Sequence, residues 1–133
     1  MLSYTRHPNL DFTCFVSDGE TTTENWLKTI HEYGAERMTT RELYDLRGQT
    51  NLFAKDEVGQ ILEVALKNRA IHKGNRKTAV VVDTISQFGL SRMYELKSEV
   101  EGVLTKTQVF YQLDDAIEWL GDDVAGCISN LRS

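Results

Sequence analysis

The chain is 133 residues long and carries 15 lysines and arginines against 20 aspartates and glutamates, a formal net charge of −5. This length allows one domain with its own core, so we expect residues 1–133 to form a single domain. Hydrophobic residues make up 41% of the chain, which argues against a disordered protein. The acidic excess argues against a nucleic-acid partner, which would need clustered positive charge.

Three further features bear on the cellular location. Cys14 and Cys127 lie far apart and lack the spacing of a metal site, which is typical of free thiols in a reducing compartment. No apolar run reaches the ~18 residues of a membrane span. Arg6 and Pro8 stand where a signal peptide would have its apolar region. We therefore expect a cytoplasmic protein with no membrane span, metal or cofactor.

The first elements are predicted from alternation and capping signals. Residues 2–6 and 10–17 predict a β-hairpin, because a proline turn separates them and apolar residues alternate in the second segment. Thr21 and Glu24 have the spacing of a capping box. They predict a helix that ends at Gly34.

The middle of the chain contains the clearest periodic patterns. Residues 41–46 predict a short strand, and residues 55–68 carry one apolar stripe at helical spacing. Residues 67–77 form a polar connector with a local cluster of basic residues, which we interpret as solvated. The β-branched run at residues 78–82 is typical of a central parallel strand covered on both faces.

In the last third of the chain, predicted helices and strands again alternate. Residues 87–89 predict a break, after which Ser91 begins a helix that ends near Gly102. Residues 107–111 predict a strand, and Asp114 caps a final helix. Residues 122–131 extend it with an apolar stripe that packs either on its own domain or across a homodimer contact. We favour the former slightly. The stripe consists of Val124, Cys127, Ile128 and Leu131.

The predicted elements follow the order β-β-α-β-α-β-α-β-α. Strands that alternate with helices of ten or more residues indicate βαβ crossovers. We therefore expect an α/β fold with a mostly parallel mixed sheet of about five strands and four to five helices. The first strand adds antiparallel through the hairpin.

Five segments within residues 2–120 share their order with one known family. They read Leu43-Tyr44-Asp45-Leu46-Arg47-Gly48, Ala79-Val80-Val81-Val82-Asp83, Phe88-Gly89-Leu90-Ser91-Arg92-Met93-Tyr94-Glu95, Val109-Phe110 and Ala116-Ile117-Glu118-Trp119-Leu120. Together they resemble the SpoIIAA-like branch of the STAS superfamily, which includes anti-sigma-factor antagonists and cytoplasmic domains of sulfate transporters. The resemblance implies a sheet overlaid by helices, no catalysis, and docking to protein partners. Some members bind nucleotide, and distant structural ties lead to lipid carriers.

One departure from that family concerns regulation. Anti-sigma-factor antagonists carry a phosphorylated serine in the loop after the strand that corresponds to residues 41–46. Here the loop, residues 47–55, contains no serine, and Thr50 stands in no matching motif. We therefore do not expect the phosphorylation switch.

Polar residues are expected where parallel strands end, because ligands bind beyond the carboxyl ends of such strands. Asp45 and Asp83 on neighbouring strands would either share a proton or a cation, or cap turns and pair with arginines. Arg92 would either clamp an anion at a helix N-terminus or pair with one of these carboxylates. The full set of candidate binding residues is Asp45, Arg47, Gly48, Thr50, Asp83, Ser86 and Arg92.

Three functions follow as hypotheses. The weakest is an enzyme that uses Asp45 and Asp83. The first is a regulatory domain that acts through a protein partner, for which a flat exposed surface at residues 47–53 would be evidence. The second is a carrier or sensor of a small apolar or anionic ligand, lipid-like or nucleotide. A pocket of about 300 Å³ or more would favour the second. The aromatic and sulfur side chains expected to line it are Trp26, Phe88, Met93 and Trp119.

Overall fold

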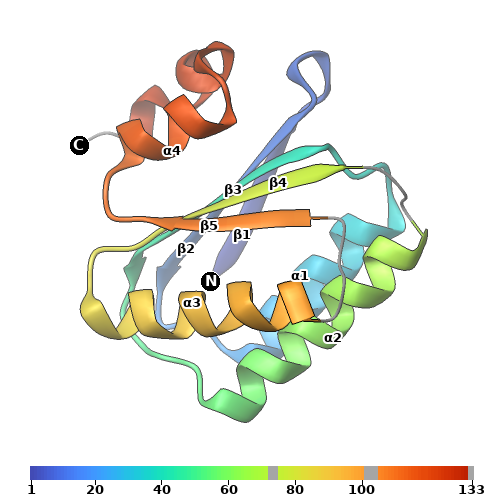
Figure 1. The fold of residues 1–133 in the computed structure, drawn as a ribbon, viewed down its shortest axis with the longest axis vertical. Coiled ribbons are helices and arrows are strands. Elements are labelled where there is room, and N and C mark those ends of the chain that lie inside the picture. The colour runs from blue at the N-terminus through green and yellow to red at the C-terminus, as the bar shows by residue number, and fades with distance from the viewer. Residues whose placement is uncertain (72–74, 101–104, 132–133) are drawn as a thin grey trace.

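A five-stranded mixed sheet forms the centre of the computed structural model (Figure 1), which describes residues 1–71, 75–100 and 105–131. The strands are β1 (Leu2–His7), β2 (Phe12–Gly19), β3 (Arg41–Gln49), β4 (Arg76–Val81) and β5 (Thr105–Phe110). They lie side by side in chain order. β1 pairs antiparallel with β2, and all other neighbours pair parallel. The predicted α/β class and the mixed sheet of about five strands are confirmed.

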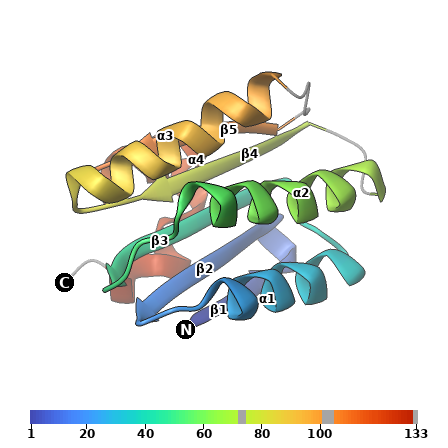
Figure 2. The ribbon, with the colours of Figure 1, turned by 90° about the horizontal axis from the view of Figure 1, so that it is seen from below.

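The helices divide between the two faces of the sheet. They are α1 (Thr23–Ala35), α2 (Lys55–Ile71), α3 (Ile85–Val100) and α4 (Leu113–Leu120), with 3-10 segments η1 (Pro8–Leu10) and η2 (Asp122–Leu131). α1, α2 and α3 lie next to one another across one face, and α4 and η2 lie on the other (Figure 1, Figure 2). Each of the first three connects neighbouring parallel strands, and crossovers of one hand place such helices on the same face. In the described part of the chain, none combines the length and apolar character needed to cross a bilayer.

The sheet separates two hydrophobic cores, because side chains alternate between its faces along each strand. Val81 packs with Ile117 on the α4 face, and Phe15 packs with Ile30 on the three-helix face. β4 is covered on both faces, since Val80 is 8% exposed and Val81 is fully buried. This strand lies inside the sheet, between β3 and β5.

α3 begins earlier than the sequence pattern predicts. The expected break at residues 87–89 is wrong, because these residues lie in the first turns of α3. Thr84 supplies the physical reason: its hydroxyl oxygen accepts a hydrogen bond from the backbone N–H of Gln87 (3.1 Å). This cap satisfies one of the free N–H groups at the start of the helix.

The C-terminal segment η2 packs on its own chain. Val124 and Ile128 are buried in the core of the α4 face. The guanidinium of Arg41 on β3 donates to both carboxylate oxygens of Asp123 (2.7 and 2.9 Å), which fastens η2 to the sheet. The side chain of Leu131 lies outside the described part of the chain.

The predicted solvated basic connector is wrong for its last two residues. Arg76 is 5% exposed and donates to the backbone carbonyl of Thr39. The ammonium of Lys77 lies 5.1 Å from the centre of the Trp119 ring and donates to the Trp119 carbonyl (3.1 Å). The connector residues His72 and Lys73 lie outside the described residues.

Candidate functional site

A cavity of about 100 Å³ lies between the sheet and the three helices on its three-helix face. We call it the helix-side cavity. Figure 2 shows α1, α2 and α3 laid over this face of the sheet. The residues that line the helix-side cavity come from all three helices, the strands and one loop. They include Trp26, Ile30 and Tyr33 from α1, Val58, Ile61 and Ala65 from α2, Leu90 and Tyr94 from α3, Tyr44, Leu46, Thr78 and Val80 from the strands, and Leu52 and Phe53 from the loop after β3.

Aromatic rings form one wall of the cavity. The ring of Tyr44 stacks on Phe15 with centres 4.1 Å apart and lies nearly parallel to Trp26 at 5.7 Å. Phe53 meets Trp26 edge-on at 5.4 Å. Parallel-offset and edge-on contacts are the favoured arrangements of aromatic rings. The wall is therefore held by contacts among its own rings.

The indole N–H of Trp26 is buried in this wall. Trp26 is 7% exposed, and its Nε1 atom has no hydrogen-bond partner among the described residues. An indole nitrogen can only donate, and buried donors normally have an acceptor. This donor therefore lies inside the packed wall, out of contact with solvent.

A buried polar network lies beneath one end of the cavity. The phenol of Tyr33 donates to Glu42 Oε2 (2.7 Å), and the hydroxyl of Thr78 donates to Glu42 Oε1 (3.0 Å). Burial raises the pKa of Tyr33 well above its usual value, and the nearby Glu42 carboxylate raises it further. Tyr33 is therefore a neutral donor at physiological pH. The hydroxyl groups of Tyr33 and Thr78 are both hydrogen-bonded to Glu42. The rest of the cavity lining is mainly apolar.

The mouth of the cavity is formed by the loop after β3, which buried amides hold in place. Gln49 Nε2 donates to the Asn51 carbonyl (2.9 Å), and Gln87 Nε2 donates to the carbonyls of Leu46 (2.9 Å) and Gln49 (3.2 Å). Leu52 lies beside these amides and is 50% exposed. The loop after β3 thus borders the opening of the cavity.

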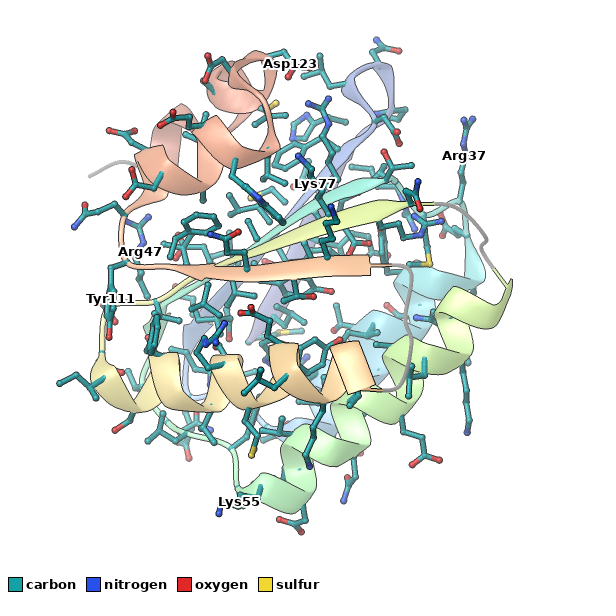
Figure 3. All side chains as sticks on the ribbon, viewed as in Figure 1. Arg37, Arg47, Lys55, Lys77, Tyr111 and Asp123 are labelled. Atoms are coloured by element: carbon teal, nitrogen blue, oxygen red, sulfur yellow. The ribbon has the colours of Figure 1, made fainter. Side chains whose placement is uncertain are left out.

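Six of the seven predicted site residues lie near the carboxyl ends of β3 and β4, and Arg92 lies two turns into α3; none of them lines the cavity. Asp45 lies two residues after Leu43 on β3, so it shares the face of Leu43 and points toward the α4 side of the sheet. Its carboxylate accepts two hydrogen bonds from the guanidinium of Arg47 (2.9 and 3.0 Å). The hydrogen bonds that Arg47 donates to Asp45 raise the pKa of Arg47, and the charge of Asp83 adds to this effect. Figure 3 labels Arg47 at this edge of the sheet.

The arginine–carboxylate pairings partly differ from those expected. Asp45 pairs with Arg47, which was one of the predicted alternatives. Arg92 pairs with Glu95 in its own helix (2.5 Å) and not with Asp45 or Asp83, so that alternative is wrong. Among the described residues, no three His, Cys, Asp or Glu side chains group as a metal site would require.

The remaining predicted residues do not converge on one point. Thr50 and Ser86 are exposed, and the backbone N–H of Thr50 donates to the carbonyl of Gly19 (3.0 Å). Gly48 lies close to Asp18, because an added Cβ would be 2.7 Å from the Asp18 carboxylate. These positions lie near the same edge of the sheet, and none of them lines the helix-side cavity.

Sequence reasoning located only part of the cavity. Trp26 was expected to line a pocket, and it does. The other three residues expected there, Phe88, Met93 and Trp119, are not among its described lining residues. Trp119 lies on the opposite face, beside Phe110. The other lining residues could have been found from the apolar residues on the inner sides of α1, α2 and α3. That pattern can be recognised only when the three helices are known to cover the same face of the sheet.

Comparison with known proteins adds no relative: no protein-family model matches the chain, and neither curated proteins nor solved structures give a match.

Proposed function

We propose that this chain is a non-catalytic, STAS-like binding domain and that a small apolar molecule in the helix-side cavity is its ligand. The observation that carries the proposal is the cavity itself, which is apolar, partly open and lined by all three helices and the sheet. Apolar pockets with a few polar groups are the usual form of small-molecule sites.

The size of the cavity limits what enters it. Its volume of about 100 Å³ is smaller than the ~300 Å³ typical of pockets that hold a whole drug-sized ligand. It is closer to the ~150 Å³ of an engineered cavity that binds benzene. We therefore propose that one ring or a short branched chain enters, and that any larger remainder of the ligand stays at the mouth beside Leu52.

The STAS-like character of the domain is part of the same proposal. It rests on the five sequence segments that resemble the SpoIIAA-like branch, together with the sequential sheet and the three helices on one face. The loop after β3 lacks a serine, so we propose ligand occupancy, in place of phosphorylation, as the controlling event. Both cysteines are free thiols, which is consistent with a reducing cytoplasm.

Native mass spectrometry of the purified protein and titration with toluene test the proposal. We expect either a co-purifying small molecule or a rise in melting temperature with toluene, because a ligand that binds only the folded state stabilises it. The same spectra give the subunit number and so test for a homodimer. No bound molecule together with no toluene-dependent shift would contradict the proposal.

A cavity-filling variant makes this test specific. Ala65→Phe places a ring in the cavity and should abolish the toluene shift while the circular dichroism spectrum is retained. Val58→Phe serves the same purpose if Ala65→Phe does not fold. Leu96→Phe adds the same kind of bulk at a position that is 50% exposed and should leave the shift unchanged.

Exposed apolar side chains at the carboxyl ends of the strands favour protein docking as a second function. Ile85 follows β4 and is 84% exposed, and Tyr111 follows β5 and is 46% exposed. Large apolar side chains that gather on a surface are characteristic of interaction sites. We propose that a protein partner covers this edge, whether or not the cavity is occupied.

Quantitative co-purification with wild type and with the double variant Ile85→Ser, Tyr111→Ser tests the second function. A single protein in stoichiometric amount with wild type, and reduced at least tenfold with the variant, is the expected result. An identical set of proteins with both would count against docking at this edge. The toluene shift should be the same in both, which separates the two functions.

A further inference from the structure

We propose that the outer face of α3 binds the same face of a second copy of this chain, so that two α3 helices lie antiparallel in a symmetric dimer. This inference rests on the second proposed function, protein docking, and names the partner that covers Ile85. It does not depend on the helix-side cavity or on a ligand there.

α3 differs from its two neighbours in the side chains that it exposes to solvent. Apart from Ala35, every exposed residue that the structure describes in α1 and α2 is charged or polar. α3 instead exposes Ile85 at 84% and Leu96 at 50%. It lies at the end of the row of three helices, beside α2 (Figure 2). Large apolar side chains gathered on an outer face are characteristic of an interaction surface.

The exposed residues of α3 form a single stripe along the helix. Ile85, Gly89, Arg92 and Leu96 follow one another at helical spacing, which places all four on one side. The α3 residues that line the helix-side cavity lie on the opposite side. The stripe is about 16 Å long, because each helical residue adds about 1.5 Å. It therefore has a large apolar side chain near each end and a glycine and an arginine between them.

The centre of the stripe has free space and a charge that is already balanced. A Cβ added at Gly89 would meet no atom within 4 Å. The guanidinium of Arg92 donates to Glu95 of the same helix (2.5 Å), and its side chain remains 44% exposed. The centre can therefore accept a long side chain from a partner, and its arginine brings no uncompensated charge into the contact.

The order of the four residues is complementary to a second copy of the same stripe. A two-fold axis perpendicular to α3 makes the second α3 antiparallel, and each contact then occurs twice. With this axis at the middle of the stripe, Ile85 faces Leu96 of the second copy, and Gly89 faces Arg92. Both apolar ends become covered, and each arginine lies over the free space at a glycine.

Opposite charges at the two ends of α3 favour the same arrangement. Asp83 is exposed just before the helix, and Lys97 is exposed in its last turn. In an antiparallel pair, the acidic end of each helix lies beside the basic end of the other, which is favourable. A parallel pair would bring like charges together.

Sedimentation equilibrium of the purified protein from ~1 to ~500 µM tests the proposal. One helix pair makes a small interface, so we expect a dimer that dissociates on dilution. Leu96→Ser removes two apolar contacts by symmetry and should weaken dimerisation at least ~tenfold. Leu52→Ser is the matched control: it removes the same side chain, also 50% exposed, from the loop after β3 and should leave dimerisation unchanged.

Two substitutions at Gly89 test the antiparallel register. Gly89→Arg places a second cation opposite Arg92 of the other copy, whereas Gly89→Glu places an anion there. Both variants should fold, because an added Cβ at this position meets open space. We expect Gly89→Arg to dimerise at least ~tenfold more weakly than Gly89→Glu, since like charges across an interface repel.

The outcomes separate this inference from protein docking in general. A wild type that remains monomeric over the whole range overturns the second copy. Docking then stands only if a different protein co-purifies and is lost with Ile85→Ser, Tyr111→Ser. A dimer that Leu96→Ser does not weaken forms through another surface and also overturns the inference. Equal dimerisation of the two Gly89 variants overturns the antiparallel register.

Discussion

Val81 lies in β4 with no exposed surface and packs in the core of the α4 face with Leu43 and Ile117. Val81→Asp would place a carboxylate among these side chains with no positive partner in that core. We expect the free energy of unfolding to fall by ~4 kcal/mol or more, enough to unfold many domains of this size. Urea denaturation followed by circular dichroism measures this loss.

Gln108→Asp is the control for Val81→Asp. Gln108 lies on the edge strand β5 and is exposed, so its replacement introduces the same carboxylate in contact with water. We expect a change within about 0.5 kcal/mol. A Val81→Asp protein that melts cooperatively near the wild-type temperature would mean that β4 does not form the interior of the sheet.

Cys14 makes the stability of the protein depend on pH above neutrality. Burial raises the pKa of its thiol to about 12, and the carboxylate of Asp45 adds to the rise. The unfolded chain ionises this thiol near pH 9, whereas the folded chain does not, so stability is full below pH 9 and falls as pH rises toward 12. Between pH 8 and 10.5 wild type should lose ~1–2 kcal/mol more than Cys14→Ala in urea denaturation.

Cys127→Ala is the matched control for this pH profile. Cys127 is half-buried in η2, and its removal should leave the steep decline of wild type in place. If wild type and Cys14→Ala lose stability in parallel over this range, the Cys14 thiol is not shielded from ionisation in the folded protein.

The roles of single residues were predictable where burial alone decides them. Val81 was recognised because a β-branched run has few alternatives to an interior strand. Arg92 was misassigned, since its partner Glu95 lies one helical turn away and not across the sheet. The unused N–H of Trp26 was beyond prediction, because a missing partner is a property of the packed structure.

At the scale of elements, α1 and α2 approach closely at Gly34. An added Cβ there would lie 2.3 Å from the side-chain atoms of Asn68, which is 6% exposed and donates to the carbonyl of Ile30 (3.1 Å). The amide has little room to move. Gly34→Ala should therefore lower the free energy of unfolding by ~1–3 kcal/mol, despite the higher helix propensity of alanine.

Gly59 in α2 provides the opposite case. An added Cβ there meets no atom within 4 Å, so only helix propensity counts. Gly59→Ala should raise the free energy of unfolding by up to ~1 kcal/mol. Thermal denaturation of the two variants should thus shift in opposite directions. Two stabilised proteins would show that Asn68 does not hold the helices at this distance.

Gly34 also shows why element boundaries were harder to predict than the elements. The sequence pattern placed a helix stop at this glycine, and α1 ends one residue later, at Ala35; the glycine itself lies where α1 meets Asn68 of α2. The helix α2 was easier to predict, because an apolar stripe at helical spacing has one interpretation. The start of α3 depends on the capping hydrogen bond to Thr84. In the sequence this cap is marked by a single threonine, which is a weak signal for a helix start.

For the molecule as a whole, the sequential strand order explains both the cavity and the coupling between its two faces. Three successive crossovers place α1, α2 and α3 on one face, and the cavity lies where their inner sides meet the sheet. The alternation of strands and helices in the sequence predicted this class of fold. It could not predict the cavity, because a gap of about 100 Å³ depends on how closely three helices settle against the strands.

The shared sheet predicts that both faces unfold together. Trp26 reports on the three-helix face and Trp119 on the α4 face, so the variants Trp119→Phe and Trp26→Phe each keep one reporter. Because β4 places Val81 in the core of the α4 face and Val80 in the lining of the helix-side cavity, loss of packing on either face exposes the same strand. We expect fluorescence and circular dichroism to give coincident melting curves in each variant. In Trp26→Phe, bound toluene should also raise the melting temperature reported by Trp119. A Trp119 transition that precedes the other and ignores toluene would show that α4 and η2 form a separate unit.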